Sequence, residues 1–262
     1  MKKQSRTDYA FAVGRVRALE KKMIREAVFK EAVEAKDFTA ALKLLSETGG
    51  YPEELSQVSH SEELDSVLEK EKERLHRNIE ELLEEKSIME VISGLHNPVS
   101  ILPRARESGY PFITDYIRYW IDLGNLKMLA RTKYLEYPQQ KLAQIIMKGG
   151  FLDPEILLQN YERSLLEMGE KLKASSYQSF WNQAVHTLEK EETFVELEKG
   201  LENFLMDYLK KAKYVVFGPE PVFAYALAKR KELNMIRLVG VGKINQIPAS
   251  TLKGRISQTY VG

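Results

Sequence analysis

The chain contains no cysteine. This absence excludes disulfide bonds, thiolate metal sites and cysteine nucleophiles, and it fits a reducing cytosol. No window reaches the roughly 18 consecutive apolar residues of a membrane-spanning helix, and the basic N-terminus lacks the apolar run of a signal peptide. Lys and Arg number 39 against 38 Asp and Glu, so net charge gives no reason to expect nucleic acid as a partner. We therefore predict a chain that neither crosses a membrane nor is exported.

The common catalytic and nucleotide-binding motifs are also missing. No GxSxG or similar nucleophile motif occurs. The run VGVGK ends in Gly-Lys, but Arg237 and Ile244 stand where a phosphate-binding loop needs Gly and Ser or Thr. The histidines lack zinc-site spacing and are His60, His76, His96 and His186. We predict no catalytic residue, no metal site, no cofactor and no small-molecule substrate, and hence a chain that is not an enzyme.

What the sequence does contain is a series of amphipathic patterns. Apolar residues recur at spacings of three and four, and hydrophobic and charged contents of 44% and 29% are typical of a soluble protein with exposed helix faces. The main predicted helices span 9–28, 38–47, 61–83, 114–133, 162–173, 177–190 and 194–211. The only strand-like stretch, 214–217, is too short. The predicted fold class is therefore all-α, with amphipathic helix bundles arranged in series.

Local signals refine these helices. Asp37 is the expected N-cap of the helix over 38–47, which Gly49 and Gly50 end. Three prolines and a glycine within 97–111 indicate a boundary. The first helix is expected to expose a basic face. Its apolar residues, which are expected to point inward, are Phe11, Val13, Val16, Leu19, Met23 and Ala27.

The most strongly patterned stretch is 217–255. Pro219 and Pro221 predict a helix start just after them. One helical stripe then carries Val222, Tyr225, Ala226, Leu233, Ile236 and Val239. Gly240 and Gly242 are expected to loosen this helix, and Pro248 precedes a short closing helix.

An internal repeat is indicated at an offset of 110 residues. Val13, Val16, Arg17 and Leu19 align with Leu123, Leu126, Lys127 and Leu129, and these with Leu233, Ile236, Arg237 and Val239. Lys133 aligns with Lys243. We expect two complete helical repeats over 1–105 and 106–212, and closing signature helices over 213–262 that form a partial third repeat.

The C-terminal elements FGPEPVFAY, ALAKRKE, LNMIR, VGVGKINQIP and LKGRI follow one another in the order of a known signature. Together with the N-terminal YAFAVGRVRALE, this stretch resembles the C subunit of the V/A-type ATP synthase, which is homologous to the d subunit of the eukaryotic vacuolar ATPase. Members of that family have three similar helical domains around a funnel-shaped centre, and this chain resembles a shortened member.

The resemblance implies a non-catalytic central-stalk subunit of a rotary ATPase. Such a subunit binds the other stalk subunits and the membrane ring that carries protons or sodium ions, on the cytoplasmic side and without spanning the membrane. Six cations on the repeated helices are the expected contacts with acidic partners: Arg15, Arg17, Lys127, Arg131, Arg237 and Lys243. Alternatively, Lys127 and Arg237 satisfy helix ends or acidic neighbours within the fold. The alternative function is a helical-repeat scaffold that binds an unrelated protein.

Overall fold

The computed structural model describes residues 5–173 and 175–262. Within these residues the chain forms 15 α-helices and two short 3-10 helices and no β-strand, which confirms the all-α fold class. The chain divides into two compact units: unit 1 holds the residues up to Ile92 together with 206–262, and unit 2 holds 93–205. The internal repeat and the division at residues 105 and 212 stay predictions.

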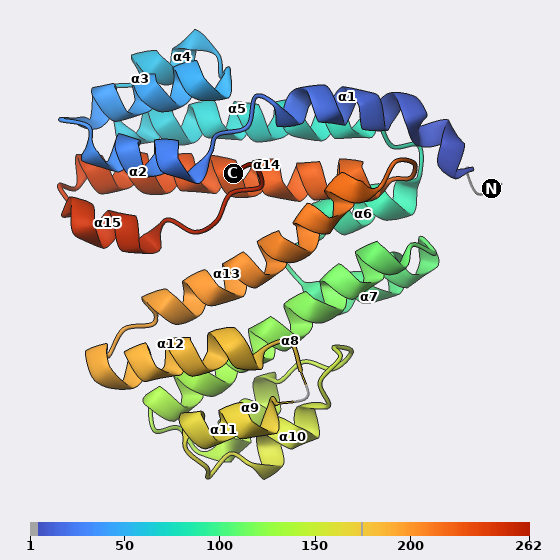
Figure 1. The fold of residues 1–262 in the computed structure, drawn as a ribbon, viewed down its shortest axis with the longest axis vertical. Helices are drawn as coiled ribbons and strands as arrows, with labels where there is room; N and C mark the ends of the chain where they lie inside the picture. Colours follow the sequence, from blue (N-terminus) through green and yellow to red (C-terminus); the bar gives the residue numbers. More distant parts are fainter. Residues whose placement is uncertain (1–4, 174) are drawn as a thin grey trace. The chain divides into compact units, whose positions relative to one another are not determined.

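Unit 1 is built from both ends of the sequence. Its elements are η1 (Arg6–Tyr9), α1 (Ala10–Glu20), α2 (Glu26–Glu34), α3 (Phe38–Gly49), α4 (Glu53–Gln57), α5 (Ser61–Glu80), α6 (Lys86–Ser93), η2 (Lys211–Tyr214), α14 (Glu220–Ile244) and α15 (Ala249–Arg255). Helix α14 runs alongside α5 and also contacts α1, α2, α3 and α15 (Figure 1). The N-terminal helices thus complete their core with the C-terminal signature helix.

The end signals of α3 are those expected from the sequence. The Asp37 side chain accepts a hydrogen bond from the backbone N of Ala40 at 2.8 Å, which satisfies one of the free donors of the first turn. Gly50 ends the helix at φ 60°, a left-handed conformation that favours glycine. Ala41, Leu42 and Leu45 are buried against α14 residues such as Ile236 in one core cluster.

The single helix predicted over 9–28 is wrong in extent, because the chain turns between α1 and α2. In this turn Met23 and Ile24 are buried, and the Ile24 N–H donates to Glu232 instead of continuing a helix. The helical spacing of apolar residues in α1 does not continue through this turn, so Ala27, which was expected to be buried, is exposed. Phe11 is 75% exposed, since α1 buries the adjacent face that carries Val13 and Val16.

Helix α14 is longer than the sequence predicts. It continues through Gly240 and Gly242 to Ile244, so the expected loosening at these glycines is wrong. Both glycines are packing positions: a Cβ atom on Gly240 would lie 2.5 Å from Leu64 Cδ2, and one on Gly242 would lie 2.4 Å from Leu252 Cδ2. The glycines thus allow α5 and α15 to approach the helix closely.

Unit 2 contains the middle of the chain. Its helices are α7 (Pro98–Glu107), α8 (Pro111–Tyr134), α9 (Gln139–Ile145), α10 (Pro154–Gln159), α11 (Leu165–Lys171), α12 (Gln178–Glu191) and most of α13 (Val195–Lys210). The proline-rich segment expected to be a boundary contains α7, which Asn97 caps and Pro98 begins. One apolar cluster includes Leu126 of α8 and Trp181 of α12, both fully buried.

Candidate partner-binding surface

The signature helix is first of all a core element. All residues from Glu220 to Ala228 are buried, and so are the six residues of the predicted stripe, which confirms that part of the interpretation. The Glu220 carboxylate accepts a hydrogen bond from Arg6 Nη1 at 2.8 Å, so the start of α14 is tied to the N-terminus. Gly218 precedes it at φ 128°, and a Cβ atom there would lie 2.2 Å from Glu220 Oε2. The FGPEP motif therefore shapes the start of α14 and its contact with Arg6.

A buried carboxylate ties the N-terminal helices to α14. Glu232 is 2% exposed, and its Oε2 accepts from the Ile24 N–H at 2.7 Å. Its Oε1 accepts from the Tyr51 hydroxyl and from Lys229 Nζ, each at 2.5 Å. Burial and the adjacent Glu232 carboxylate raise the pKa of the Tyr51 hydroxyl well above its usual value. The acid is thus satisfied by groups from three separate segments of unit 1.

Unit 2 contains a similar arrangement on α8. Asp122 is fully buried and accepts from the Tyr177 hydroxyl at 2.7 Å and from the Phe151 N–H at 2.7 Å. The Leu152 N–H donates to the same carboxylate at 3.1 and 3.2 Å. A Cβ atom on Gly150 would lie 1.8 Å from Asp122 Oδ1, so the loop backbone reaches the acid only through a glycine. Burial raises the pKa of the Asp122 carboxyl.

Sequence reasoning missed both carboxylates, although a signal was present. Asp122 and Glu232 are aligned by the offset of 110 residues that relates their helices. Each is a buried acid on a helix of the apolar core, and each receives a tyrosine hydroxyl and a backbone N–H. Burying a carboxylate costs free energy unless it has hydrogen-bond partners inside the fold. An acid at the same place in two repeated apolar helices could therefore have been recognised from the sequence as a buried, hydrogen-bonded group.

The candidate contact residues of α1 differ in what holds them. Arg15 Nη1 lies 3.6 Å from the exposed Glu81 carboxylate. Arg17 Nη1 donates to both oxygens of the nearly buried Glu20, at 2.8 and 2.9 Å. Arg17 Nη2 donates to the carbonyl oxygens of Ala212, Lys213 and Val215. Arg17 is therefore an internal tie, whereas the Arg15 side chain remains 41% exposed.

The two candidates on α14 also have partners within unit 1. Arg237 makes a two-pronged contact with Asp65 of α5, at 2.7 and 3.1 Å. These hydrogen bonds hold the pKa of the Asp65 carboxyl below its usual value. Lys243 Nζ donates to the carbonyl oxygen of Ala35, which lies just beyond the end of α2. Arg237 thus pairs with an acidic neighbour within the fold, as one of the two alternatives for this residue proposed.

The candidates of unit 2 share one acid. Lys127 Nζ and Arg131 Nη2 each lie 2.8 Å from Glu198 Oε1 on α13. The Arg131 guanidinium is also 5.8 Å from the centre of the Phe194 ring. Lys127 and Arg131 thus share Glu198 as an acidic partner within unit 2.

The four candidates that lie in unit 1 do not form one cluster. Asp65 and Glu81, the partners of Arg237 and Arg15, are separated by 16 residues along α5 and its end. At 1.5 Å per residue that is about 24 Å. Contact of any of the six with another protein stays a prediction.

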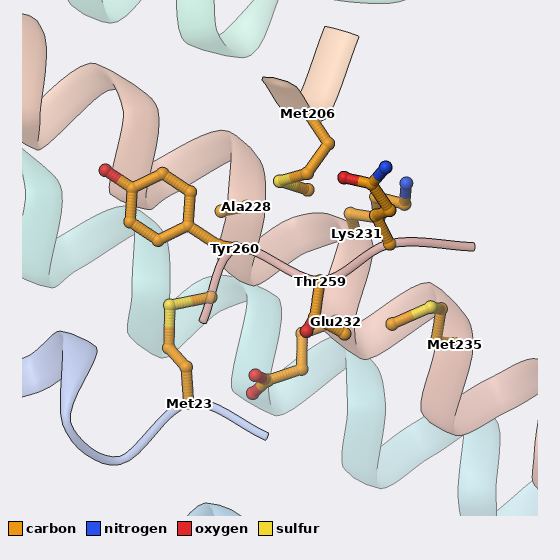
Figure 2. A pocket seen from close by; sticks show the side chains of 9 residues that line it. Met23, Met206, Ala228, Lys231, Glu232, Met235, Thr259 and Tyr260 are labelled. Carbon is orange, nitrogen blue, oxygen red and sulfur yellow. The ribbon is translucent and has the colours of Figure 1, made fainter. Parts of the chain in front are cut away.

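Figure 2 shows a small hollow of unit 1 between α14, the turn that precedes α2, the last turns of α13 and the C-terminal tail. Its lining residues are Met23, Met206, Ala228, Lys231, Glu232, Met235, Gln258, Thr259 and Tyr260. It has no room for a water molecule. Over the described residues, no group of three or more acidic, histidine or cysteine side chains is placed to hold a metal ion. No helix within 5–173 or 175–262 is long and apolar enough to span a membrane.

Comparison with known proteins agrees with the resemblance found in the sequence. The C subunit of the V-type sodium ATPase of Enterococcus hirae is 26% identical over 187 residues, which cover 70% of this chain and 56% of the relative. The C subunit of the A-type ATP synthase of Archaeoglobus fulgidus is 27% identical over 139 residues, covering 53% of this chain and 40% of the relative. The chain thus spans about half the length of the curated relatives it matches. The family model of the ATP synthase (C/AC39) subunit matches residues 99–255, more than half of the chain. The chain therefore belongs to the ATP synthase (C/AC39) subunit family.

Proposed function

We propose that this chain is a non-catalytic central-stalk subunit of a rotary V/A-type ATPase. In that role it couples rotation of the stalk to the membrane ring that carries protons or sodium ions. Family membership over residues 99–255 is the observation that carries the proposal. Its place in the complex would be peripheral, on the cytoplasmic side of the membrane, with the stalk subunits and the ring as partners.

Mechanical coupling requires a body that resists shear, and the packing of unit 1 supports this role. Helix α14 is buried on every side over its first two turns and contacts five other helices. Close-packed interiors are nearly incompressible and transmit strain. The Glu232 carboxylate adds directional bonds between α14 and segments near Ile24 and Tyr51. Sliding of α14 would break these bonds and leave buried polar groups without partners.

Among the six candidate cations, we propose that the exposed ones contact acidic partners. Arg131 and Arg237 are each 52% exposed and Arg15 is 41% exposed, although each already has a carboxylate nearby. Exposed ion pairs contribute little to stability, so exchange of one carboxylate for another costs little. Arg17 holds backbone carbonyl groups as well as the Glu20 carboxylate, and Lys243 holds the Ala35 carbonyl. The primary role of both is therefore structural.

Capture experiments test the function directly. The purified full chain, immobilised at low salt, is expected to retain the central-stalk subunits of a rotary ATPase and to bind the detergent-solubilised membrane ring. A matched column that carries an unrelated helical protein provides the background. If neither the stalk nor the ring is retained above that background, the proposal is wrong, and the scaffold function becomes the better hypothesis.

A charge exchange separates partner contact from stability. The double variant Asp65→Arg with Arg237→Asp keeps an ion pair between α5 and α14 but reverses its direction. If Arg237 contacts an acidic partner, this variant loses capture while its unfolding midpoint stays near that of the wild type. Lys36→Glu, at an 83% exposed side chain, is the control for a charge change elsewhere in unit 1. Unchanged capture by the exchanged pair would remove Arg237 from the proposed interface.

A further inference from the structure

Lys213 lies in η2 of unit 1, where α1, the last turn of α13 and the segment after α15 contribute its surroundings. Arg17 Nη2 donates to the Lys213 carbonyl oxygen at 2.9 Å, which fixes the backbone at this position. The Lys213 Nζ lies 4.8 Å from the centre of the ring of the buried Tyr260. The Lys213 side chain is partly exposed, and its amine is not one of the fully buried atoms. Lys213 thus presents an amine at the edge of a packed region, within reach of small reagents.

The acids nearest to this amine are already paired with other cations. The Glu20 carboxylate accepts two hydrogen bonds from Arg17 Nη1, at 2.8 and 2.9 Å. The Asp207 carboxylate lies 3.6 Å from Lys210 Nζ. Within residues 5–173 and 175–262, no carboxylate forms an ion pair with Lys213. The Lys213 ammonium is therefore a cation without a counter-charge of its own.

This environment favours the neutral form of the Lys213 amine. Burial lowers the pKa of the amine, the Glu20 carboxylate opposes this effect, and the Lys210 and Arg17 cations add to it. The face of the Tyr260 ring attracts the charged form, but burial and the two cations outweigh it. At neutral pH a larger fraction of Lys213 is therefore unprotonated than of a lysine in open water.

We propose that Lys213 is a site of N-acylation by small acyl phosphates. The unprotonated amine attacks the carbonyl carbon of the acyl group. A C–N bond forms, the C–O bond to the phosphate breaks and leaves its electron pair on the phosphate, and the amine proton passes to water. No general base contacts the amine within the described residues, so the donor must already be activated, as a mixed anhydride of a carboxylic acid and phosphate is. Lys211 is a second exposed cation without an ion-pair partner in this part of the chain, and the two cations attract an anionic donor.

Acylation would change how η2 holds the segment after α15. Lys210 Nζ donates to Gln258 Oε1 at 2.8 Å, and Lys213 lies over the Tyr260 ring, so both lysines contact this segment. An acylated Lys213 is a neutral amide, which no longer makes a cation–π contact with Tyr260. The inference goes beyond the coupling function, because it requires neither the stalk nor the ring.

Acetylation of the full chain by acetyl phosphate, followed at each lysine by peptide mass spectrometry, tests the proposal. Near neutral pH, Lys213 of the folded chain is expected to react at least about threefold faster than Lys36, whose side chain is 83% exposed. In concentrated urea the two lysines should react at nearly equal rates, because the surroundings of Lys213 are lost. In the folded chain the rate at Lys213 should also reach its plateau at a lower pH than the rate at Lys36.

A charge variant tests the role of the surroundings. Lys210→Glu replaces a repelling cation with a carboxylate, so it should slow acetylation of Lys213 by at least about threefold, whereas the matched control Lys36→Glu should leave that rate unchanged. The proposal is overturned if Lys213 reacts no faster than Lys36 in the folded chain, or if the rate at Lys213 is the same in Lys210→Glu. A preference for Lys213 that persists in urea would also overturn it, because the local sequence would then be the cause. This assay contains neither stalk nor ring, so its failure leaves the proposed function standing.

Discussion

Removal of the Asp122 carboxylate should destabilise unit 2 strongly. In Asp122→Ala three donors lose their acceptor: the buried Tyr177 hydroxyl and the partly buried N–H groups of Phe151 and Leu152. An unsatisfied buried donor costs about 1–3 kcal/mol, and local relaxation recovers part of the sum, so we expect a loss of about 3–5 kcal/mol. Tyr177→Phe removes one donor and leaves the carboxylate with its two backbone partners. Its expected cost is about 1–2 kcal/mol.

Tryptophan fluorescence during urea unfolding is the suitable assay, because both tryptophans of the chain lie in unit 2. Trp181 is fully buried in the same apolar cluster as Tyr177, and its indole N–H donates to the Leu165 carbonyl at 2.9 Å. Four proteins complete a double-mutant cycle: the wild type, the two single variants and the double variant. In the Asp122→Ala background, loss of the tyrosine hydroxyl removes an orphaned donor, so Tyr177→Phe should cost nothing or restore stability.

The pH dependence gives a second readout. Because burial raises the pKa of Asp122 in the folded state, its contribution is fully present below the unfolded pKa of about 3.9 and is lost as pH rises through the folded value. Asp122→Asn cannot titrate. The stability of the wild type relative to Asp122→Asn should therefore increase on acidification from pH 7 and level off near the unfolded pKa.

Two results would refute this reasoning about Asp122. If Tyr177→Phe costs as much in the Asp122→Ala background as in the wild type, the hydroxyl and the carboxylate do not interact. If the stability difference between the wild type and Asp122→Asn is the same at every pH, the burial of the acid has no energetic consequence. Fluorescence that fails to follow the variants would instead contradict the placement of Trp181 beside this network.

Further predictions concern unit 1. Glu232→Ala should lower the unfolding free energy of unit 1 by about 3–5 kcal/mol, because the buried Tyr51 hydroxyl and Ile24 N–H lose their acceptor and the partly buried Lys229 ammonium loses its counter-charge. Circular dichroism during unfolding measures the change, and a loss below about 1 kcal/mol would contradict the network. The pair Asp65–Arg237 should show a coupling energy of at most about 1 kcal/mol in a double-mutant cycle, because both side chains are exposed. This coupling energy should be smaller in high salt and should be lost as the pH falls below the usual range of an Asp pKa. A coupling energy that does not change with salt would contradict this expectation. Gly14→Ala should raise the thermal midpoint because nothing lies within 4 Å of the new Cβ, whereas Gly240→Ala should not, because its Cβ meets Leu64 at 2.5 Å. Equal shifts for the two glycines would contradict the packing at α14.

The sequence alone determined the all-α class, the family and several helix ends. Apolar spacing is a local property, so the stripe on α14 was predicted correctly and is buried. Asp37 and Gly50 act at the ends of α3 through contacts within a few residues, which is why their roles were readable. The ordered C-terminal signature identified the family, since it depends on residue order and not on packing.

Only the tertiary structure decided which residues meet across long sequence separations. Glu232 contacts Ile24 and Tyr51, and no periodicity predicts such pairs, because the chain must first bring them together. The same holds for Phe11: an apolar residue at helical spacing was expected inside, yet α1 buries the neighbouring face. The partners of the candidate cations were decided in this way too, because an ion pair depends on distance in space, which the order of residues along a chain does not specify.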